Sequence, residues 1–216
     1  MNISKNSSDN MQTRTYYRTD CIVFKKTKET FGGLSNMAGG FPIKINDISI
    51  LTAEALYQAC RFPRLPDVQE LIITQKSPMA AKMVGKPYRK DSRPDWDTVR
   101  VKIMSWCLRV KLACNWYEFG ELLHATGDKP IVEDSRKDRF WGAVAEDDEI
   151  LVGNNVLGRL LMKLREELKS EDIDDLKIVK PLLIDEFLLY HKSFPTIHAD
   201  LEVKVKLNDH RQYDLF

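Results

Sequence analysis

The chain has 216 residues, of which 43% are hydrophobic and 30% are charged, a composition typical of a globular protein with a normal core. Disorder is therefore excluded for most of the chain, and the length fits one large domain or one domain with an extension. The 33 lysines and arginines nearly balance the 32 acidic residues, and the formal net charge of +1 argues against a protein that coats polyanions generally.

The cysteine pattern and the N-terminal sequence indicate a reducing compartment. Cys21, Cys60, Cys107 and Cys114 form no C-x-x-C pair, and the first ten residues lack the apolar core of a signal peptide. Charged residues interrupt the apolar runs well short of the ~20 residues that span a bilayer. We therefore expect a cytoplasmic protein with no membrane role.

Composition divides the chain into three parts. Residues 1–19 are polar and show no periodicity, which predicts a flexible N-terminal arm. An acidic stretch follows Lys169, after which short apolar runs alternate with prolines. We expect a compact domain over residues 20–168 and a C-terminal extension of unknown role over residues 169–216.

Local patterns predict a few short strands and a larger helical part. A β-favouring run covers residues 21–24, and residues 41–50 read as a β-hairpin around the turn pair Asn46-Asp47. Helices are expected at residues 52–62, 67–75 and 78–84, then at 95–116 and 117–125, and finally from Asn154 or Asn155 to residue 168, with a strand at 130–133.

The helix predicted over residues 95–116 has the clearest apolar stripe. Its apolar residues recur at alternating spacings of 4 and 3, so they share one helix face that must point into the core. They are Val99, Ile103, Trp106, Val110 and Ala113.

Several common catalytic motifs are missing. The sequence contains no G-x-G-x-x-G, P-loop, G-x-S-x-G or H-E-x-x-H motif, and its four histidines are scattered without metal-ligand spacing. We therefore expect neither a cofactor nor a metal ion.

The helix predicted at residues 52–62 combines polar and apolar groups. Glu54, Gln58 and Arg61 follow the spacing i, i+4, i+7, with Tyr57 beside them. A carboxylate near a helix N-terminus, held by an amide and a guanidinium, is a candidate acid, base or ion-stabilising group. The alternative is a surface stripe of i, i+4 pairs with no catalytic role.

A second cluster mixes charges with rings. Residues 133–142 read EDSRKDRFWG, and Gly153-Asn154-Asn155 follow shortly after. Carboxylates can accept from ribose hydroxyls, and aromatic rings can stack on bases or sugars, so this composition suits a sugar or nucleotide site. The alternative is a charged loop anchored by Trp141.

Basic residues concentrate in one stretch. Residues 82–111 hold nine basic and three acidic residues. On the predicted helix, Arg100 with Lys111 and Lys102 with Arg109 flank opposite sides of the apolar stripe. They form a candidate surface for nucleic-acid or pyrophosphate anions, although a solvated helix margin has the same pattern.

Seven landmarks, in this order, resemble the NADAR (YbiA-like) family. They begin with the loop FGGLSN at 31–36 and the helix TAEALYQACRF at 52–62, and continue with Ser77-Pro78 and Asp95-Trp96. The last are Glu133-Asp134-Ser135, Asp138-x-Phe140-Trp141-Gly142, and the segment from Gly153 to Arg165.

The resemblance implies a compact, predominantly helical α+β fold and an N-glycosidase, which cleaves the bond between a ribose anomeric carbon and nitrogen. It implies Glu54 and Asp138 as the catalytic carboxylates, one stabilising the cationic transition state and the other activating water or moving a proton. The expected ligand-binding residues are Asn36, Tyr57, Gln58, Trp96, Trp141, Gly142, Asn154 and Arg165.

The sequence departs from the common family pattern at two positions. Ala55 stands where histidine is frequent, and Arg61 stands where lysine is common. Any role of that histidine in other members therefore does not transfer to this chain.

Three segments, at residues 31–43, 55–69 and 87–113, most resemble the members that accompany DarT-type DNA ADP-ribosyltransferases. This resemblance implies an antitoxin that removes ADP-ribose from guanine in DNA, with a DarT-like toxin as partner. The basic flanks of the helix predicted over residues 95–116 agree with it, and we expect Arg100, Lys102, Arg109 and Lys111 to contact DNA. Two alternatives stay open: an N-glycosidase acting on phosphoribosylamino intermediates of riboflavin synthesis, and a non-catalytic ADP-ribose binding module. A binding module does not need both Glu54 and Asp138, so their joint presence favours an enzyme.

Overall fold

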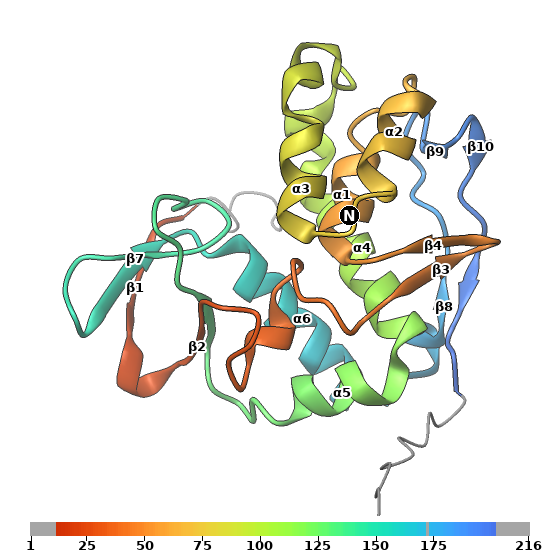
Figure 1. The fold of residues 1–216 in the computed structure, drawn as a ribbon. Helices are drawn as coiled ribbons and strands as arrows, with labels where there is room; N and C mark the ends of the chain where they lie inside the picture. Colours follow the sequence, from red (N-terminus) through yellow and green to blue (C-terminus); the bar gives the residue numbers. More distant parts are fainter. Residues whose placement is uncertain (1–11, 172, 202–216) are drawn as a thin grey trace, which may run out of the picture.

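A long central helix, α4 (Trp96–Cys114), organises the fold in the computed structural model, which describes residues 12–171 and 173–201. Figure 1 shows α6 running beside α4, with α1, α2 and α3 gathered at one end. All five residues of the predicted apolar stripe of α4 are buried, and so are Met104, Cys107, Leu108 and Leu112 on its other sides. The helix is therefore covered from several directions, by α1, α5, α6 and β3 among others.

The predicted helices are confirmed, with ends that differ by a few residues. Thr52 caps α1 by accepting a hydrogen bond from the amide of Ala55 at 3.2 Å, and Ser77 accepts from the amide of Ala80 at 3.5 Å to begin α3. The other helices are α1 (Ala53–Ala59), α2 (Pro66–Ile73), α3 (Pro78–Val84), α5 (Trp116–His124) and α6 (Val156–Lys169), with 3₁₀ turns η2 (Arg18–Asp20), η3 (Gly32–Leu34), η4 (Lys86–Asp91) and η5 (Ile173–Lys177).

The strands are short and form only small sheets beside the helices. The predicted α+β fold, predominantly helical and with an N-terminal hairpin, is therefore confirmed. The hairpin of β3 (Ile43–Ile45) and β4 (Ile48–Ile50) turns at Asn46, whose φ is 52°. Strand β2 (Ile22–Phe24) pairs in parallel with β5 (Ile131–Glu133). The remaining strands are β6 (Val144–Ala145), β7 (Ile150–Gly153), β8 (Ile178–Val179), β9 (Leu188–Leu189), β10 (Lys192–Ser193) and β11 (Ile197–His198).

The prediction of a flexible arm over residues 1–19 is wrong for its last part. Strand β1 (Arg14–Tyr17) pairs antiparallel with β7, which also pairs with β6. The side chain of Tyr16 is buried in a small cluster with Val132, Ala143 and Leu151, and a mostly polar segment does not reveal this apolar contact. Residues 1–11 lie outside the described part of the chain.

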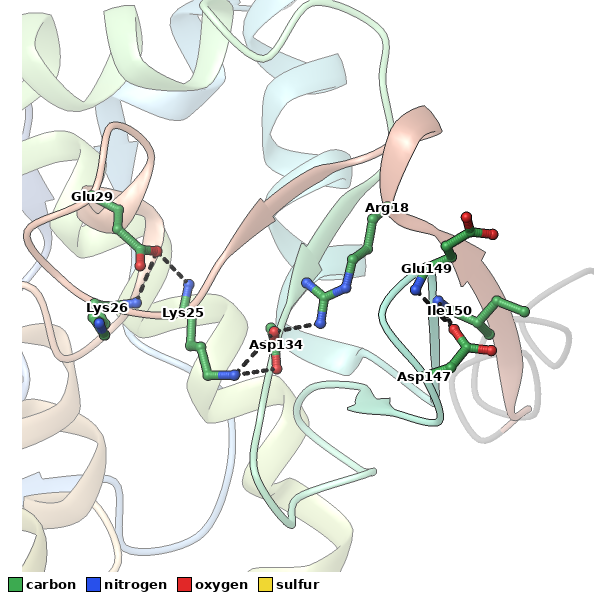
Figure 2. A network of polar contacts seen from close by, with 8 residues as sticks. All are labelled: Arg18, Lys25, Lys26, Glu29, Asp134, Asp147, Glu149 and Ile150. Atoms are coloured by element: carbon green, nitrogen blue, oxygen red, sulfur yellow. Dashed lines mark hydrogen bonds and ion pairs between the residues drawn. The ribbon is translucent and has the colours of Figure 1, made fainter.

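One ion-pair network ties this N-terminal segment to the sheet (Figure 2). The carboxylate of Asp134 is nearly buried and accepts from Arg18 at 2.8 Å and from Lys25 at 3.2 Å. The amide of Asp134 donates to the carbonyl of Phe24 at 2.9 Å. Asp134 therefore joins β1 and β2 to the loop that starts at Ser135.

The predicted boundary at residue 168 does not separate a domain from an extension. Trp106 of α4 contacts the rings of Phe187 and Phe194, each with its centroid 4.8 Å away, and donates from Nε1 to the carbonyl of Lys180 at 2.9 Å. Residues 173–201 thus complete the main core, and residues 202–216 lie outside the described part.

The predicted N-cap position of α6 is confirmed at Asn155, but the side-chain cap is not. Asn155 adopts a left-handed conformation with φ of 49° and makes no side-chain cap. Its side chain instead bridges to β5, donating to the carbonyl of Ile131 at 2.8 Å and accepting from the amide of Glu133 at 3.1 Å. This bridge fixes the end of β5 against the start of α6.

Lys111 of α4 is a buried cation with no carboxylate partner in the described part of the chain. Its ammonium donates to the carbonyls of Gly33 at 2.6 Å and Ser35 at 3.0 Å, and it lies over the rings of Phe41 and Phe119. Burial lowers its pKa from 10.5 to about 7. Lys111 is therefore not a surface residue: it lies inside the protein, where its two hydrogen bonds hold the 33–35 loop in place.

Within residues 12–171 and 173–201, no helix is both long and apolar enough to cross a membrane.

Substitution by alanine should have opposite effects on stability at two glycines that lie in helices. An added Cβ at Gly158 of α6 would overlap the carbonyl oxygen of Ile131, whereas one at Gly120 of α5 would meet only Leu112, at 3.9 Å. We expect Gly158→Ala to lower the free energy of unfolding by more than about 2 kcal/mol and Gly120→Ala to raise it by up to about 1 kcal/mol. Urea unfolding measures both, and equal effects would contradict the predicted close packing of α6 on β5.

The buried Lys111 predicts how stability depends on pH. Between about pH 7 and pH 10.5 the unfolded chain holds a proton on Lys111 that the folded chain has lost, so this residue makes stability rise with pH across that range. In Lys111→Met that contribution disappears, and the gain in unfolding free energy between pH 7 and pH 9.5 should be smaller than in the wild type. Lys192→Met, at an exposed lysine, is the control; parallel curves for all three proteins would contradict the burial of the charge.

Candidate active site

A cavity of about 300 Å³ lies where α1, α3 and α4 meet the loop after β5. Elements far apart in the sequence contribute to its wall, which combines carboxylates, cations and aromatic rings. Its lining includes Asn36, Glu54, Tyr57, Gln58, Arg61, Lys82, Arg89, Trp96, Arg100, Glu133, Ser135, Asp138 and Trp141.

Glu54 is the buried centre of the site, with only 3% of its surface exposed. Its two carboxylate oxygens accept from different amides, one from Asn36 and the other from Gln58 at 2.9 Å. The amide of Glu54 donates in turn to the carbonyl of Asn36 at 2.9 Å. Burial raises the pKa of Glu54, while Lys82 and the two side-chain amides act against that rise.

The predicted grouping on α1 is thus confirmed for Gln58 but not for Arg61. Arg61 donates to Ser92 Oγ at 2.7 Å and places its guanidinium 4.9 Å from the ring centroid of Trp96. Asn36, from the loop that Lys111 holds, is the second amide instead. The carboxylate is therefore fixed from two elements, which makes it a rigid group.

Asp138 lies in an exposed loop but has a defined orientation. One of its carboxylate oxygens accepts from the amides of Phe140 and Trp141, both at 2.9 Å, and its own amide donates to Ser135 Oγ at 3.0 Å. The other oxygen has no hydrogen-bond partner among the described residues. Asp138 therefore presents one free acceptor at the cavity.

Glu133 is a third carboxylate at the cavity, and the sequence analysis did not select it as a site residue. Its side chain forms no hydrogen bond within the described residues. Burial raises its pKa to about 7, opposed by Lys82 and reinforced by Asp138 and Glu54. Its place at the carboxyl end of the parallel strand β5 is the sequence signal that could have identified it, since side chains at that edge commonly face a ligand site.

Aromatic rings form one wall. Tyr57 lies with its ring centroid 5.0 Å from that of Trp96 and 5.7 Å from that of Trp141. Burial raises the pKa of Tyr57, so its phenol is neutral at physiological pH. The predicted ligand-binding residues Tyr57, Trp96 and Trp141 are therefore brought together, where they can exclude water or stack on a planar group.

Cations surround the carboxylates. Arg61, Lys82, Arg89 and Arg100 all line the cavity. The guanidinium of Arg100 lies 4.0 Å from the ring centroid of Phe140, and its closest ion-pair contact is a distant one to Asp97, at 3.8 Å. Such an excess of cations around a polar cavity suits an anionic ligand.

Three predicted ligand-binding residues do not line the cavity. Gly142 packs where an added Cβ would overlap the carbonyl of Glu133, and Asn154 accepts a hydrogen bond from Thr13 Oγ1 at 3.0 Å. Arg165 is buried and donates to the carbonyl of Lys129 at 2.7 Å and to Thr126 Oγ1 at 3.0 Å. These residues support the loops behind the cavity, which explains why they belong to the motif without touching its interior.

The four predicted DNA contacts do not form one surface. Arg100 lines the cavity, while Lys102 and Arg109 line a separate hollow of about 420 Å³, where Arg109 pairs with Glu167 at 2.6 Å. The prediction is wrong for Lys111, which is fully buried. Neighbouring elements therefore cover only part of the flanks of α4: Lys102 is exposed, whereas Arg100 and Arg109 are half-buried.

Among the described residues, no group of three or more His, Cys, Asp and Glu side chains is arranged to hold a metal ion. None of the four cysteines, all of which lie in the described part of the chain, forms a disulfide.

Comparison with known proteins identifies the family of this chain. Residues 23–169 match the NADAR domain. The chain is 35% identical to the N-glycosidase YbiA of Escherichia coli over 150 residues, covering 69% of this chain and 89% of that protein. It is 34% identical to an N-glycosidase of Nostoc punctiforme, covering 69% of this chain and 93% of that protein. A riboflavin biosynthesis protein of Vibrio vulnificus is 33% identical over 69% of this chain, but the match covers only 39% of that protein.

The solved NMR structure of E. coli YbiA has the same fold, with a TM-score of 0.59, 31% identity and coverage of 73% of this chain and 93% of that one. These relatives support the predicted class of activity, hydrolysis of an N-glycosyl bond. By the extent of the family match and the identity to its members, the chain belongs to the NADAR family.

Proposed function

We propose that this protein hydrolyses the bond between ribose and nitrogen in ADP-ribosylated guanine of DNA, and that it acts as an antitoxin to a DarT-like ADP-ribosyltransferase. The observation that supports this proposal is the composition of one cavity, where Glu54, Glu133 and Asp138 lie with aromatic rings and four cations. The carboxylates suit cleavage of a riboside, and the cations suit the pyrophosphate of ADP-ribose.

Glu54 has the properties of a charge-stabilising group. Breaking an N-riboside bond builds positive charge on the sugar ring, and a fixed carboxylate stabilises that charge without having to reorient. Asn36 and Gln58 occupy both oxygens of Glu54 as donors, which favours the ionised form and fixes its orientation. We assign to Glu54 the stabilisation of the oxocarbenium-like transition state.

Glu133 and Asp138 have the properties of proton-transfer groups. Glu133, with a pKa of about 7, can protonate the departing nitrogen, and Asp138 can accept a proton from water through its unoccupied oxygen. The ribose–nitrogen bond breaks, the nitrogen gains a proton from Glu133, and the water oxygen bonds to the anomeric carbon. These steps use side chains of the protein, so the proposed reaction is metal-independent.

A second candidate substrate is a phosphoribosylamino intermediate of riboflavin synthesis. It is favoured by the names of relatives from Vibrio vulnificus and Zea mays, which are riboflavin biosynthesis proteins. Both substrates carry a ribose–nitrogen bond and phosphate, so the cavity chemistry suits either. A non-catalytic reader of ADP-ribose would have no use for three carboxylates in one cavity.

A parallel assay separates these possibilities. Purified protein is incubated with an oligonucleotide carrying ADP-ribosylated guanine and, separately, with the phosphoribosylamino pyrimidine, and released ADP-ribose or ribose phosphate is measured. We expect release from the oligonucleotide, at a rate that EDTA leaves unchanged. Release from the pyrimidine alone would favour the second candidate, and binding of ADP-ribose without any release would indicate a reader.

Removing the charge of Glu54 should impair turnover more than binding. Glu54→Gln keeps the size of the side chain but cannot stabilise the developing cation, and we expect kcat to fall by at least ~10²-fold while ligand affinity is retained. Asp138→Asn should lower kcat similarly. Thermal unfolding of both variants tests whether the fold persists, and near-normal rates in a folded Glu54→Gln variant would remove Glu54 from the mechanism.

Glu133 predicts the pH dependence of the reaction. Because burial raises its pKa from 4.5 to about 7, Glu133 is protonated below pH 7 and can act as an acid there, so kcat/KM should fall as pH rises above about 7. In Glu133→Gln we expect a rate about 10²-fold lower and the loss of this descending limb. An unchanged profile in the variant would assign the proton transfer to another group.

A further inference from the structure

The segment formed by α3 and η4, residues 78–91, makes one side of the cavity mouth and carries an unusual surface. Lys82 and Arg89 line the cavity, whereas Lys86, Tyr88 and Lys90 are exposed and do not line it. In Figure 1, α3 stands at the top of the molecule, at the end of the helical cluster. The segment therefore extends the charge of the cavity outward along the surface.

The cations of this segment are not neutralised. Lys82, Lys86, Arg89 and Lys90 form no ion pair with the described residues, and the only acid in the segment is Asp91. Elsewhere several surface cations are paired: Arg109 with Glu167 at 2.6 Å, Lys169 with Asp128 at 2.5 Å and Lys177 with Asp174 at 2.6 Å.

The opposite side of the mouth is basic as well. Ser135 and Asp138 line the cavity, and between them Arg136 and Lys137 are exposed without an ion pair to the described residues. Cations on both sides of one opening form a track for a chain of negative charges that passes across the cavity.

Apolar and aromatic groups lie among the cations of the α3–η4 segment. Tyr88 is 37% exposed, and Met79 and Met83 are 57% and 48% exposed. An exposed ring between lysines is the arrangement on which single-stranded nucleic acids stack their bases while their phosphates contact the cations. A simple phosphate ligand would use the charges but not the ring.

We propose that the α3–η4 segment, with Arg136 and Lys137 across the mouth, is a binding surface for single-stranded nucleic acid that holds the nucleotides flanking the target base. This inference deepens the proposed function and rests on it for the identity of the modified base. We infer a single strand because Glu54 is buried in the wall of the cavity, and a base that stays stacked inside a duplex cannot bring its ribose–nitrogen bond to that carboxylate. The surface replaces the α4 footprint that the sequence suggested.

Binding of an unmodified strand tests the surface independently of catalysis. The probe is a short fluorescein-labelled oligothymidylate, and affinity is measured by fluorescence anisotropy over a series of salt concentrations. In the double variant Lys86→Glu, Lys90→Glu we expect at least about tenfold weaker binding and a logarithmic salt slope smaller by roughly 1.4, since each phosphate contact on a single strand contributes about 0.7. In Tyr88→Ala we expect at least about fivefold weaker binding with an unchanged salt slope, because stacking releases no counterions.

Two matched variants serve as comparisons. The double variant Lys44→Glu, Lys192→Glu makes the same change of charge at exposed lysines away from the cavity and should retain the wild-type salt slope. The double variant Lys102→Glu, Lys180→Glu changes the second hollow, where Lys102, Arg109 and Lys180 lie. A reduced slope there, with an unchanged slope in Lys86→Glu, Lys90→Glu, would overturn the proposal and place the strand on α4. Equal losses in all three double variants would show a response to net charge alone and would also overturn it.

Steady-state kinetics on two substrates distinguish a failure of this binding surface from a failure of the proposed reaction. Lys86→Glu, Lys90→Glu should raise KM for an ADP-ribosylated oligonucleotide by about tenfold but leave kcat/KM for ADP-ribosylated guanosine unchanged, because that substrate has no flanking phosphates. If the wild type binds oligothymidylate as described but hydrolyses neither substrate, the proposed reaction fails and the surface stands. If the wild type hydrolyses both and binds oligothymidylate no better than the variant does, the surface fails and the reaction stands.

Discussion

A carboxylate buried among helices is costly, and much of the structure around the cavity offsets that cost at Glu54. Removing an ionised carboxylate from water costs several kcal/mol even in a real protein interior. Three elements contribute to its stabilisation: the 33–36 loop through Asn36, α1 through Gln58, and α3 through the charge of Lys82. Because all three elements interact with the carboxylate of Glu54, the position of each depends on the positions of the other two. The cavity forms at the point where these elements come together.

The residues that position Glu54 are themselves held in place by further hydrogen bonds. Asn36 follows a loop whose carbonyls at Gly33 and Ser35 are held by the ammonium of Lys111. A buried lysine is itself costly, so a second charge is desolvated to orient the partner of the first. This arrangement suits a site that must keep its geometry while charge develops in it, since preorganised groups need no rearrangement during the reaction.

The sequence predicted the helical part of the fold well, because helix signals are local. The caps at Thr52 and Ser77 and the apolar stripe of α4 can be read within one turn or a few turns of chain. Strand β1 could not be predicted, because its partner β7 lies more than a hundred residues away and its own sequence is mostly polar. The same limit applies to residues 173–201, because Phe187 and Phe194 contact Trp106 from a distant part of the chain.

For the candidate site, motif residues and cavity residues overlap only in part. Glu54, Asp138 and the aromatic residues were predicted from patterns and resemblance, and they line one cavity. Glu133 was not selected, because a glutamate at a strand end resembles any solvated carboxylate until burial is known. Lys111 was misassigned to the surface for the converse reason: a helical wheel shows which side a charge is on, but not which neighbouring element covers it.

The contacts of Asp134 show that the region shared by the family and the unit that folds are different in this protein. The family match begins at residue 23, yet Arg18, which lies before it, holds the aspartate next to the loop of Ser135 and Asp138. At the other end the match stops at residue 169, while the rings that enclose Trp106 come from later in the chain. Segments outside the shared region therefore brace the loop of Ser135 and Asp138 and the central helix, so a change in these segments can alter the rigidity of the cavity wall without any change in the residues that line it.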